Sequence, residues 1–235
     1  SESGIVSEFV RFDPNRRNDQ VFDTLNPVHN RQTVPIDLTQ SKEEVWEGYE
    51  ARNQRAIRQA QESPLEIDRE YNESDIQQFH TIYTNAMDAR DAADHYRFPL
   101  QFFEKLVDSE LCSPVIARYE GDVVGGFLIA HDDAYSHHYL SASNPDYWDD
   151  RVNNLMYHEA VMYMHDTGRK VFDFQGGRPG VFKFKKGFSP DRREFYIGRR
   201  VHQAEAYDAL VDAAAAAGIE TDTGYFPAYR LEQSN

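Results

Sequence analysis

The most concentrated chemical feature of this sequence is a cluster of lysines. Lys183, Lys185 and Lys186 fall within four positions, although the 235 residues include only six lysines and carry a formal net charge of −15. Ammonium groups gathered in an acidic chain are typical of a site that binds an anion or stabilises negative charge developing in a reaction. We expect Lys183, Lys185 and Lys186 to form an anion site, with Lys185 as the first choice within it.

A glycine-rich segment, QGGRPG, precedes the lysines. It follows an apolar stretch, residues 170–174, which predicts a strand. Backbone N–H groups around Gly176, Gly177 and Gly180, together with the Arg178 side chain, could form an anion-binding loop. The alternative is that the glycines only permit a tight turn.

An extended conformation over the lysines would place alternate side chains on opposite faces. Lys183 and Lys185 would then share one face, and Lys186 would share the other with Phe182 and Phe184. The alternative to an anion site is a solvated edge strand that lysines protect from aggregation. The scarcity of lysine elsewhere favours the anion site.

Further candidates lie on the neighbouring strands. Asp173 could act as a general base if its surroundings raised its pKa, or it could cap the following loop or pair with an arginine. His138 or Tyr139 could face a cleft. Adjacent strand residues point to opposite faces, so His137 and His138, even with His131, do not predict a metal site.

Arginines line one edge of a predicted helix over residues 42–61. Arg55 and Arg58, with Arg52 before them, could contact a phosphate-bearing substrate or a tRNA, or they could be a solvated edge paired with nearby glutamates. No Gly-x-Ser-x-Gly motif occurs, and no catalytic signature surrounds the single cysteine, Cys112. We therefore expect no covalent enzyme intermediate.

The composition limits the cellular environment and the binding partners that can be expected. Forty acidic residues stand against 25 basic ones, which keeps a protein hydrated in concentrated salt. We expect a halophilic, cytoplasmic protein of haloarchaeal type; an ordinary acidic protein is the alternative. DNA binding is not expected, because duplex phosphates require a basic face. No apolar run approaches the ~20 residues that cross a bilayer, so no membrane span is predicted.

The order of the predicted elements indicates an α/β fold. Three strands in an antiparallel meander are followed by a crossover helix and more strands, which predicts a mixed sheet with flanking helices in an α/β sandwich. The predicted strands are 6–12, 34–38, 65–71, 113–119, 123–131, 135–142, 170–174 and 194–199, and the predicted helices are 42–61, 75–90 (capped by Ser74), 99–108, 153–167 and 203–217.

Three motifs carry a family resemblance. They lie between about residues 38 and 200. The first is a helix that begins LTQSKEEVW and continues RAIRQA, the second is the hairpin EGDVVGG, and the third is DFQGG followed by FKKGF. Together they resemble Fem-type (FemA/FemB/FemX-like) proteins, the peptidoglycan interpeptide-bridge aminoacyltransferases of the GNAT superfamily of acyltransferases. The last two motifs are the ones specific to this resemblance.

This resemblance implies transfer of an acyl or aminoacyl group to an amine on a small molecule or peptide. The donor would be an aminoacyl-tRNA or an acyl-CoA, with no tightly bound cofactor and no metal. Lys185, in the Phe-Lys pair, would lie near the reacting ester and stabilise the oxyanion. The alternatives are an ordinary acetyl-CoA-dependent N-acetyltransferase and a non-catalytic GNAT-like lobe of a longer protein.

The sequence departs from the family in two respects. Fem-type proteins carry two lobes, whereas only about forty residues precede the helix here. We therefore expect residues 1–40 to be the remnant of a first lobe, 41–62 a linking helix and 63–235 the GNAT-like domain, with a missing N-terminal lobe as partner. Asp149 and Asp150 also stand where GNAT enzymes hold a pyrophosphate, which argues against acetyl-CoA.

Overall fold

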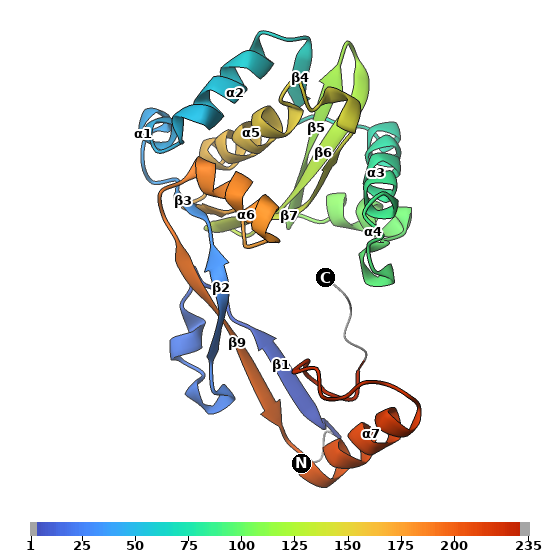
Figure 1. The fold of residues 1–235 in the computed structure, drawn as a ribbon. Coiled ribbons are helices and arrows are strands. Elements are labelled where there is room, and N and C mark those ends of the chain that lie inside the picture. Colours follow the sequence, from blue (N-terminus) through green and yellow to red (C-terminus); the bar gives the residue numbers. More distant parts are fainter. Residues whose placement is uncertain (1–3, 231–235) are drawn as a thin grey trace. The chain divides into compact units, whose positions relative to one another are not determined.

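The computed structural model describes residues 4–230, which form two compact units (Figure 1). The larger unit is residues 33–192, and the smaller one combines the two ends of the chain, up to residue 32 and from residue 193. This division differs from the predicted one, because the segment 41–62 packs into the larger unit through contacts with its crossover helix. Whether residues 1–40 derive from a first lobe stays a prediction.

A six-stranded mixed sheet forms the centre of the larger unit. Its strand order is β3-β8-β7-β6-β5-β4, in which β7 and β8 run parallel and the other neighbours are antiparallel. The predicted mixed sheet with an antiparallel meander is confirmed. The strands are β3 (Pro35–Asp37), β4 (Leu65–Asp68), β5 (Cys112–Tyr119), β6 (Asp122–His131), β7 (Tyr135–Ser143) and β8 (Val171–Asp173).

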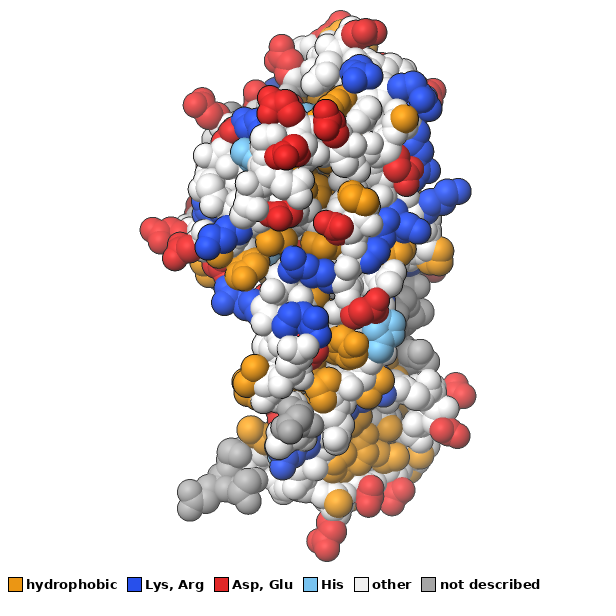
Figure 2. All heavy atoms as spheres, turned by 90° about the vertical axis from the view of Figure 1, so that its left-hand side faces the viewer, with side chains coloured by type: hydrophobic (Ala, Val, Ile, Leu, Met, Phe, Trp, Pro, Cys, Tyr) orange, Lys and Arg blue, Asp and Glu red, His pale blue; other side chains and the backbone are white. Residues whose placement is uncertain are grey.

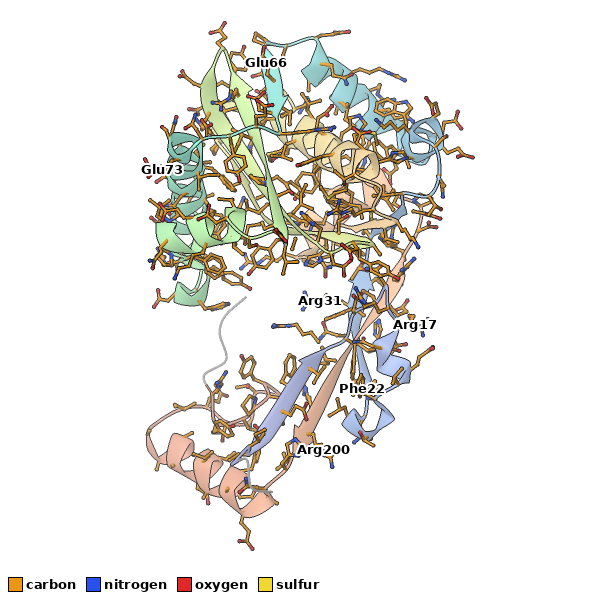
Figure 3. The ribbon with its side chains drawn as sticks, turned by 180° about the vertical axis from the view of Figure 1, so that it is seen from behind. Arg17, Phe22, Arg31, Glu66, Glu73 and Arg200 are labelled. Atoms are coloured by element: carbon orange, nitrogen blue, oxygen red, sulfur yellow. The ribbon has the colours of Figure 1, made fainter. Side chains whose placement is uncertain are left out.

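Helices cover both faces of this sheet, as an α/β sandwich requires (Figure 1). The core on one face includes residues of α2 and α5, and the core on the other includes residues of α3 and α4. Seen from behind, Glu66 on β4 and Glu73 in the first turn of α3 lie at the surface of the larger unit (Figure 3). The helices are α1 (Lys42–Glu47), α2 (Ala51–Gln61), α3 (Glu73–Asp88), α4 (Leu100–Val107), α5 (Val152–Asp166) and α6 (Pro179–Lys185).

The crossover helix α5 connects the parallel strands β7 and β8. It lies between the sheet and α2, so apolar side chains surround most of its circumference and nine of its residues are buried. The predicted helix 153–167 is thereby confirmed. No helix in the described residues has the length and apolar composition needed to cross a bilayer.

Two glycine positions shape the meander. Glu120 and Gly121 both have positive φ (52° and 94°), as the two-residue turn between β5 and β6 requires. Gly126 on β6 leaves room for a ring, because a Cβ there would lie 2.4 Å from Cγ of Phe79 on α3. The absence of a side chain thus lets α3 pack closely on the sheet.

The continuous helix predicted for residues 42–61 is wrong. The structure has two helices, α1 and α2, separated by three residues, although the predicted capping box of Ser41 and Glu44 is present. At the break Tyr49 turns into the core and the Glu50 N–H donates to the Gly187 carbonyl at 2.8 Å. This hydrogen bond to the 3-10 turn at residues 186–188 outweighs the local preference for helix.

A second boundary also differs. The helix predicted to be capped by Ser74 begins two residues earlier, with Asn72 as its N-cap. Asn72 and Asp75 exchange side chain to backbone hydrogen bonds of 3.2 and 2.8 Å. This reciprocal pair satisfies two donors at the start of the helix.

The smaller unit contains a three-stranded sheet of order β1-β9-β2 and the helix α7. Strand β2 (Val28–Thr33) was not predicted, because its sequence VHNRQT lacks the apolar alternation of a half-buried strand. Phe12, Leu25 and Ile197 are among its buried residues. The other elements are β1 (Ser7–Arg11), β9 (Arg193–Val201) and α7 (Ala204–Ala216), which confirm predicted strands and a predicted helix.

Candidate active site

The clustered lysines lie on a short helix and not on the predicted strand. Pro179 occupies the first position of α6, where its fixed φ favours a helix, and Lys186 begins a 3-10 turn after it. Two helical positions differ by about 200° around the axis, so Lys183 and Lys185 do not share a face. Lys185 is buried, whereas Lys183 and Lys186 are exposed.

Lys185 is a buried cation held in one position. Its side chain is 4% exposed, and Nζ donates a hydrogen bond to the Gly176 carbonyl at 2.8 Å. Burial lowers the pKa of Lys185 from 10.5 to about 8, against the opposing attraction of Asp173. The ammonium form therefore predominates at neutral pH, in surroundings where its field is weakly screened.

Asp173 organises the start of the glycine loop. Its carboxylate is fully buried and accepts hydrogen bonds from Thr33 Oγ1 at 2.8 Å and from the Gln175 N–H at 2.7 Å. Gln175 itself has a positive φ of 61°. These contacts fit the interpretation of Asp173 as a loop cap and counter-charge for Lys185 better than that of a general base.

The glycine loop presents an acceptor to Lys185. The carbonyl of Gly176 binds the ammonium group, Gly177 is exposed, and exposed Arg178 is the N-cap of α6. Arg178 and Gly177 therefore lie outside the buried part of the site. Gly180 lies within the first turn of α6 and lines a pocket described below.

His138 lies near Lys185, and Tyr139 lies on the other side of the sheet. A bulge in β7 places His138 opposite Ile129 of β6, with its ring 4.6 Å from that of Phe127. The pKa of His138 lies well below its ordinary value, mainly because the ring is buried and secondly because Lys185 carries a positive charge nearby. The ring is therefore neutral. Tyr139 is 40% exposed and contacts α4.

Tyr157 of α5 joins this group although the sequence analysis did not select it. Its hydroxyl lies 3.3 Å from Ser141 Oγ, which lies 3.0 Å from His138 Nε2. Burial raises the pKa of Tyr157 to about 12. No signal in the sequence separates it from Tyr163, the other tyrosine of the same helix.

A pocket of about 480 Å³ opens between α2, α5 and α6. Of the predicted binding residues, it brings together Arg55, Gly180 and Lys183. Arg58 is not part of it, because its guanidinium lies over the Trp46 ring, 5.3 Å from the centroid. The lining is Arg52, Asn53, Arg55, Ala56, Gln59, Arg151, Asn154, Gly180, Lys183 and Phe184.

The larger unit also carries a band of Lys and Arg side chains, with a few acidic ones among them, along one edge of the face that includes α1 (Figure 2). Across residues 4–230, no group of three or more His, Cys, Asp or Glu side chains is placed to hold a metal ion. The described side chains of the site supply a buried ammonium, a buried carboxylate, a neutral imidazole and hydroxyls.

A family model for the acetyltransferase (GNAT) domain matches residues 50–186, more than half of the chain. The chain therefore belongs to the GNAT acetyltransferase domain family. A search of curated proteins found no match. The matched residues include α2, the whole meander, α5 and α6, and so contain both Lys185 and the pocket.

Solved structures show the same fold at low sequence identity. FemX has a TM-score of 0.63 at 13% identity over 77% of this chain and 64% of its own. The C-terminal domain of a putative lysylphosphatidylglycerol synthetase from Agrobacterium fabrum has a TM-score of 0.52 at 13% identity, over 80% of this chain and 65% of its own. L-PGS from Bacillus licheniformis has a TM-score of 0.53 at 10% identity, over 84% of this chain and 63% of its own. The chain thus spans less than two thirds of each, and the Fem-type, GNAT-like fold is confirmed.

Proposed function

We propose that this chain transfers an acyl or aminoacyl group to an amine, with Lys185 stabilising the oxyanion. The observation that carries this proposal is the buried ammonium group of Lys185, fixed by Gly176 beside the glycine loop. A preorganised cation in a low-dielectric site stabilises developing charge without reorganising during the reaction.

The proposed reaction is a direct transfer from donor to amine. The amine nitrogen attacks the carbonyl carbon of the donor, a C–N bond forms, and the carbonyl electron pair moves to oxygen, where the Lys185 cation attracts it. Collapse of this intermediate breaks the C–O or C–S bond of the donor and expels an alcohol or a thiol. The amine proton leaves with that group or to water, so no covalent enzyme intermediate is required.

The donor we propose is an aminoacyl-tRNA or an acyl-CoA, and the acceptor is an amine on a small molecule or peptide. FemX as a fold neighbour and the name of the second neighbour, which describes formation of an aminoacylated lipid, support an aminoacyl donor. The match to an acetyltransferase family favours acetyl-CoA as the second candidate. We further propose that a first lobe completes the protein. We also propose that the protein functions in a salt-rich cytoplasm.

The pH dependence of transfer tests the role of Lys185. With its pKa at about 8, a cationic role predicts that kcat falls above pH 8, whereas a role as a neutral base predicts that kcat rises there. Lys185→Met should lower kcat about 10²- to 10³-fold, the usual effect of removing one oxyanion stabiliser. Lys105→Met, the same change at an exposed position on α4, is the control.

The assay follows transfer from acetyl-CoA and from aminoacyl-tRNA to amine-bearing peptides at high salt. Full activity of a folded Lys185→Met variant would exclude the assigned role. Inactivity of this chain together with activity of a longer chain that carries a first lobe would show that the lobe described here is not catalytic by itself.

A further inference from the structure

Tyr157 of the crossover helix α5 contacts both of the segments that meet at Lys185. Its ring centroid lies 5.1 Å from that of Phe184, the residue before Lys185, and the two ring planes are 82° apart. The same ring stacks on Phe174 at 5.3 Å, with an angle of 26°. Phe174 is the last residue before the glycine loop, whose Gly176 carbonyl accepts the hydrogen bond from Lys185 Nζ. One side chain therefore joins the segment of the lysine to the segment of its acceptor.

These contacts belong to a buried cluster of aromatic rings. Phe188, three residues after Lys185, completes it. The Phe188 ring lies 5.8 Å from that of Tyr157, and 5.3 and 5.2 Å from those of Phe184 and Phe174. Tilted and edge-to-face ring pairs about 4.5–7 Å apart stabilise a fold beyond the area that they bury. The cluster therefore holds α6 against the end of β8 and keeps water from the stem of the lysine.

The hydroxyl of Tyr157 is engaged within the protein. It lies 3.3 Å from Ser141 Oγ, which lies 3.0 Å from His138 Nε2. The register between β6 and β7 shifts at a bulge, so these two β7 side chains, three positions apart, both turn towards α5. Tyr157 is only 5% exposed, and burial raises its pKa to about 12. A hydroxyl in these surroundings is poorly placed to give a proton to a leaving group.

We infer that Tyr157 is a positioning residue, whose ring holds the Lys185 ammonium group against the Gly176 carbonyl and whose hydroxyl takes no part in proton transfer. This inference rests on the proposed function for the role of Lys185 in transfer. Loss of the ring would open space between Phe174 and Phe184. Water would then reach the lysine, and its charge would act through a medium that screens it more strongly.

A ¹³C NMR titration of the lysine ε-methylene groups tests the inference without a substrate. The chain has only six lysines, and the signal missing from Lys185→Met identifies Lys185. Tyr157→Leu should raise the pKa of Lys185 from about 8 towards 10.5, because hydration again favours the charged form. Tyr157→Phe keeps the ring and should leave this pKa at about 8. Among the described residues, Asp173 of β8 and His138 of β7 interact electrostatically with Lys185, and both are unchanged in these variants.

The pH profile of transfer should respond in the same order. In Tyr157→Leu the alkaline fall of kcat should move to higher pH. The value at pH 7 should decrease about 10²-fold, the effect of displacing a catalytic group by about 1 Å. The conservative variant Tyr157→Phe should keep most of the activity. Tyr163→Leu is the matched control, because Tyr163 lies on the same helix and its ring faces the guanidinium of Arg69 at 4.8 Å. It should change neither the profile nor the pKa of Lys185.

Phe184→Leu breaks the same ring contact from the side of α6. Phe184 is only partly buried, so this variant tests the inference even if Tyr157→Leu does not fold, and the pKa of Lys185 should again rise. An unchanged pKa in these leucine variants would overturn the inference. Equal loss of kcat in Tyr157→Phe and Tyr157→Leu would also overturn it, because the hydroxyl would then carry the role.

The two proposals can fail separately. A raised pKa of Lys185 in Tyr157→Leu, together with no transfer by the wild-type chain from any donor, would refute the proposed function and leave the positioning role intact. Transfer by the wild-type chain, together with an unchanged pKa in Tyr157→Leu, would refute the inference alone.

Discussion

Replacing Lys185 with methionine should lower activity and yet stabilise the fold. Methionine matches the unbranched shape of the lysine stem and carries no charge. The lysine is 4% exposed, and its burial is the main cause of its lowered pKa. A group kept for catalysis at the expense of stability is the expected signature of a functional site.

The magnitude follows from the pKa. The pKa falls from 10.5 to about 8, a difference of about 2.5. Because each pKa unit corresponds to about 1.36 kcal/mol, burial disfavours the charged form of Lys185 by about 3 kcal/mol. Loss of the hydrogen bond from Nζ to the Gly176 carbonyl offsets about 1 kcal/mol. We therefore expect Lys185→Met to raise the free energy of unfolding by about 2 kcal/mol at pH 7.

This gain should depend on pH. Below pH 8 the lysine is charged in both folded and unfolded chains, so the cost of burying the charge is fully present. Between pH 8 and 10.5 the folded protein loses the proton while the unfolded chain keeps it, so the wild-type protein gains stability with rising pH. The variant lacks this rise, and its advantage should shrink above pH 8.

Urea unfolding followed by circular dichroism, at pH 7 and pH 9.5 in the same KCl concentration, measures both differences. Lys105→Met controls for the loss of one surface charge and should show little change at either pH. A Lys185→Met variant that is less stable than wild type at pH 7, or a difference that is the same at both pH values, would refute the reasoning.

Four further outcomes are expected. Gly126→Ala should cost about 1–3 kcal/mol in urea unfolding because its Cβ meets the Phe79 ring, whereas Gly180→Ala, with open space around it, should cost nothing. Ser41→Ala should cost about 1 kcal/mol by loss of the α1 cap, and no change would contradict that role. Burial lowers the pKa of His158 to about 4, so wild type should lose stability as pH falls from 6.5 towards 4 while His158→Gln resists acid by up to about 3 kcal/mol; parallel curves would exclude this. Circular dichroism in dilute buffer and in molar KCl tests the halophilic prediction, which fails if stability is unchanged.

Local patterns in the sequence predicted most of the elements. The meander, the crossover helix and the strand before the glycine loop follow from alternation, capping residues and turn glycines, which act over a few neighbours. The same reasoning failed at residues 42–61, where a hydrogen bond from the Glu50 N–H to the Gly187 carbonyl accompanies a break in the helix. It also failed at the lysine cluster, where Pro179 starts a helix in place of a strand.

The sequence by itself determined the fold class and singled out Lys185 as the lysine to test, because the motif and the scarcity of lysine are properties of the chain order alone. Only the tertiary structure decided that Lys185 is buried with a lowered pKa while Lys183 faces a pocket, since a change of two positions on a helix turns a side chain to the opposite side. The pocket unites segments around residues 52–59, 151–154 and 180–184. No local pattern could predict it, because it arises from packing between distant parts of the chain.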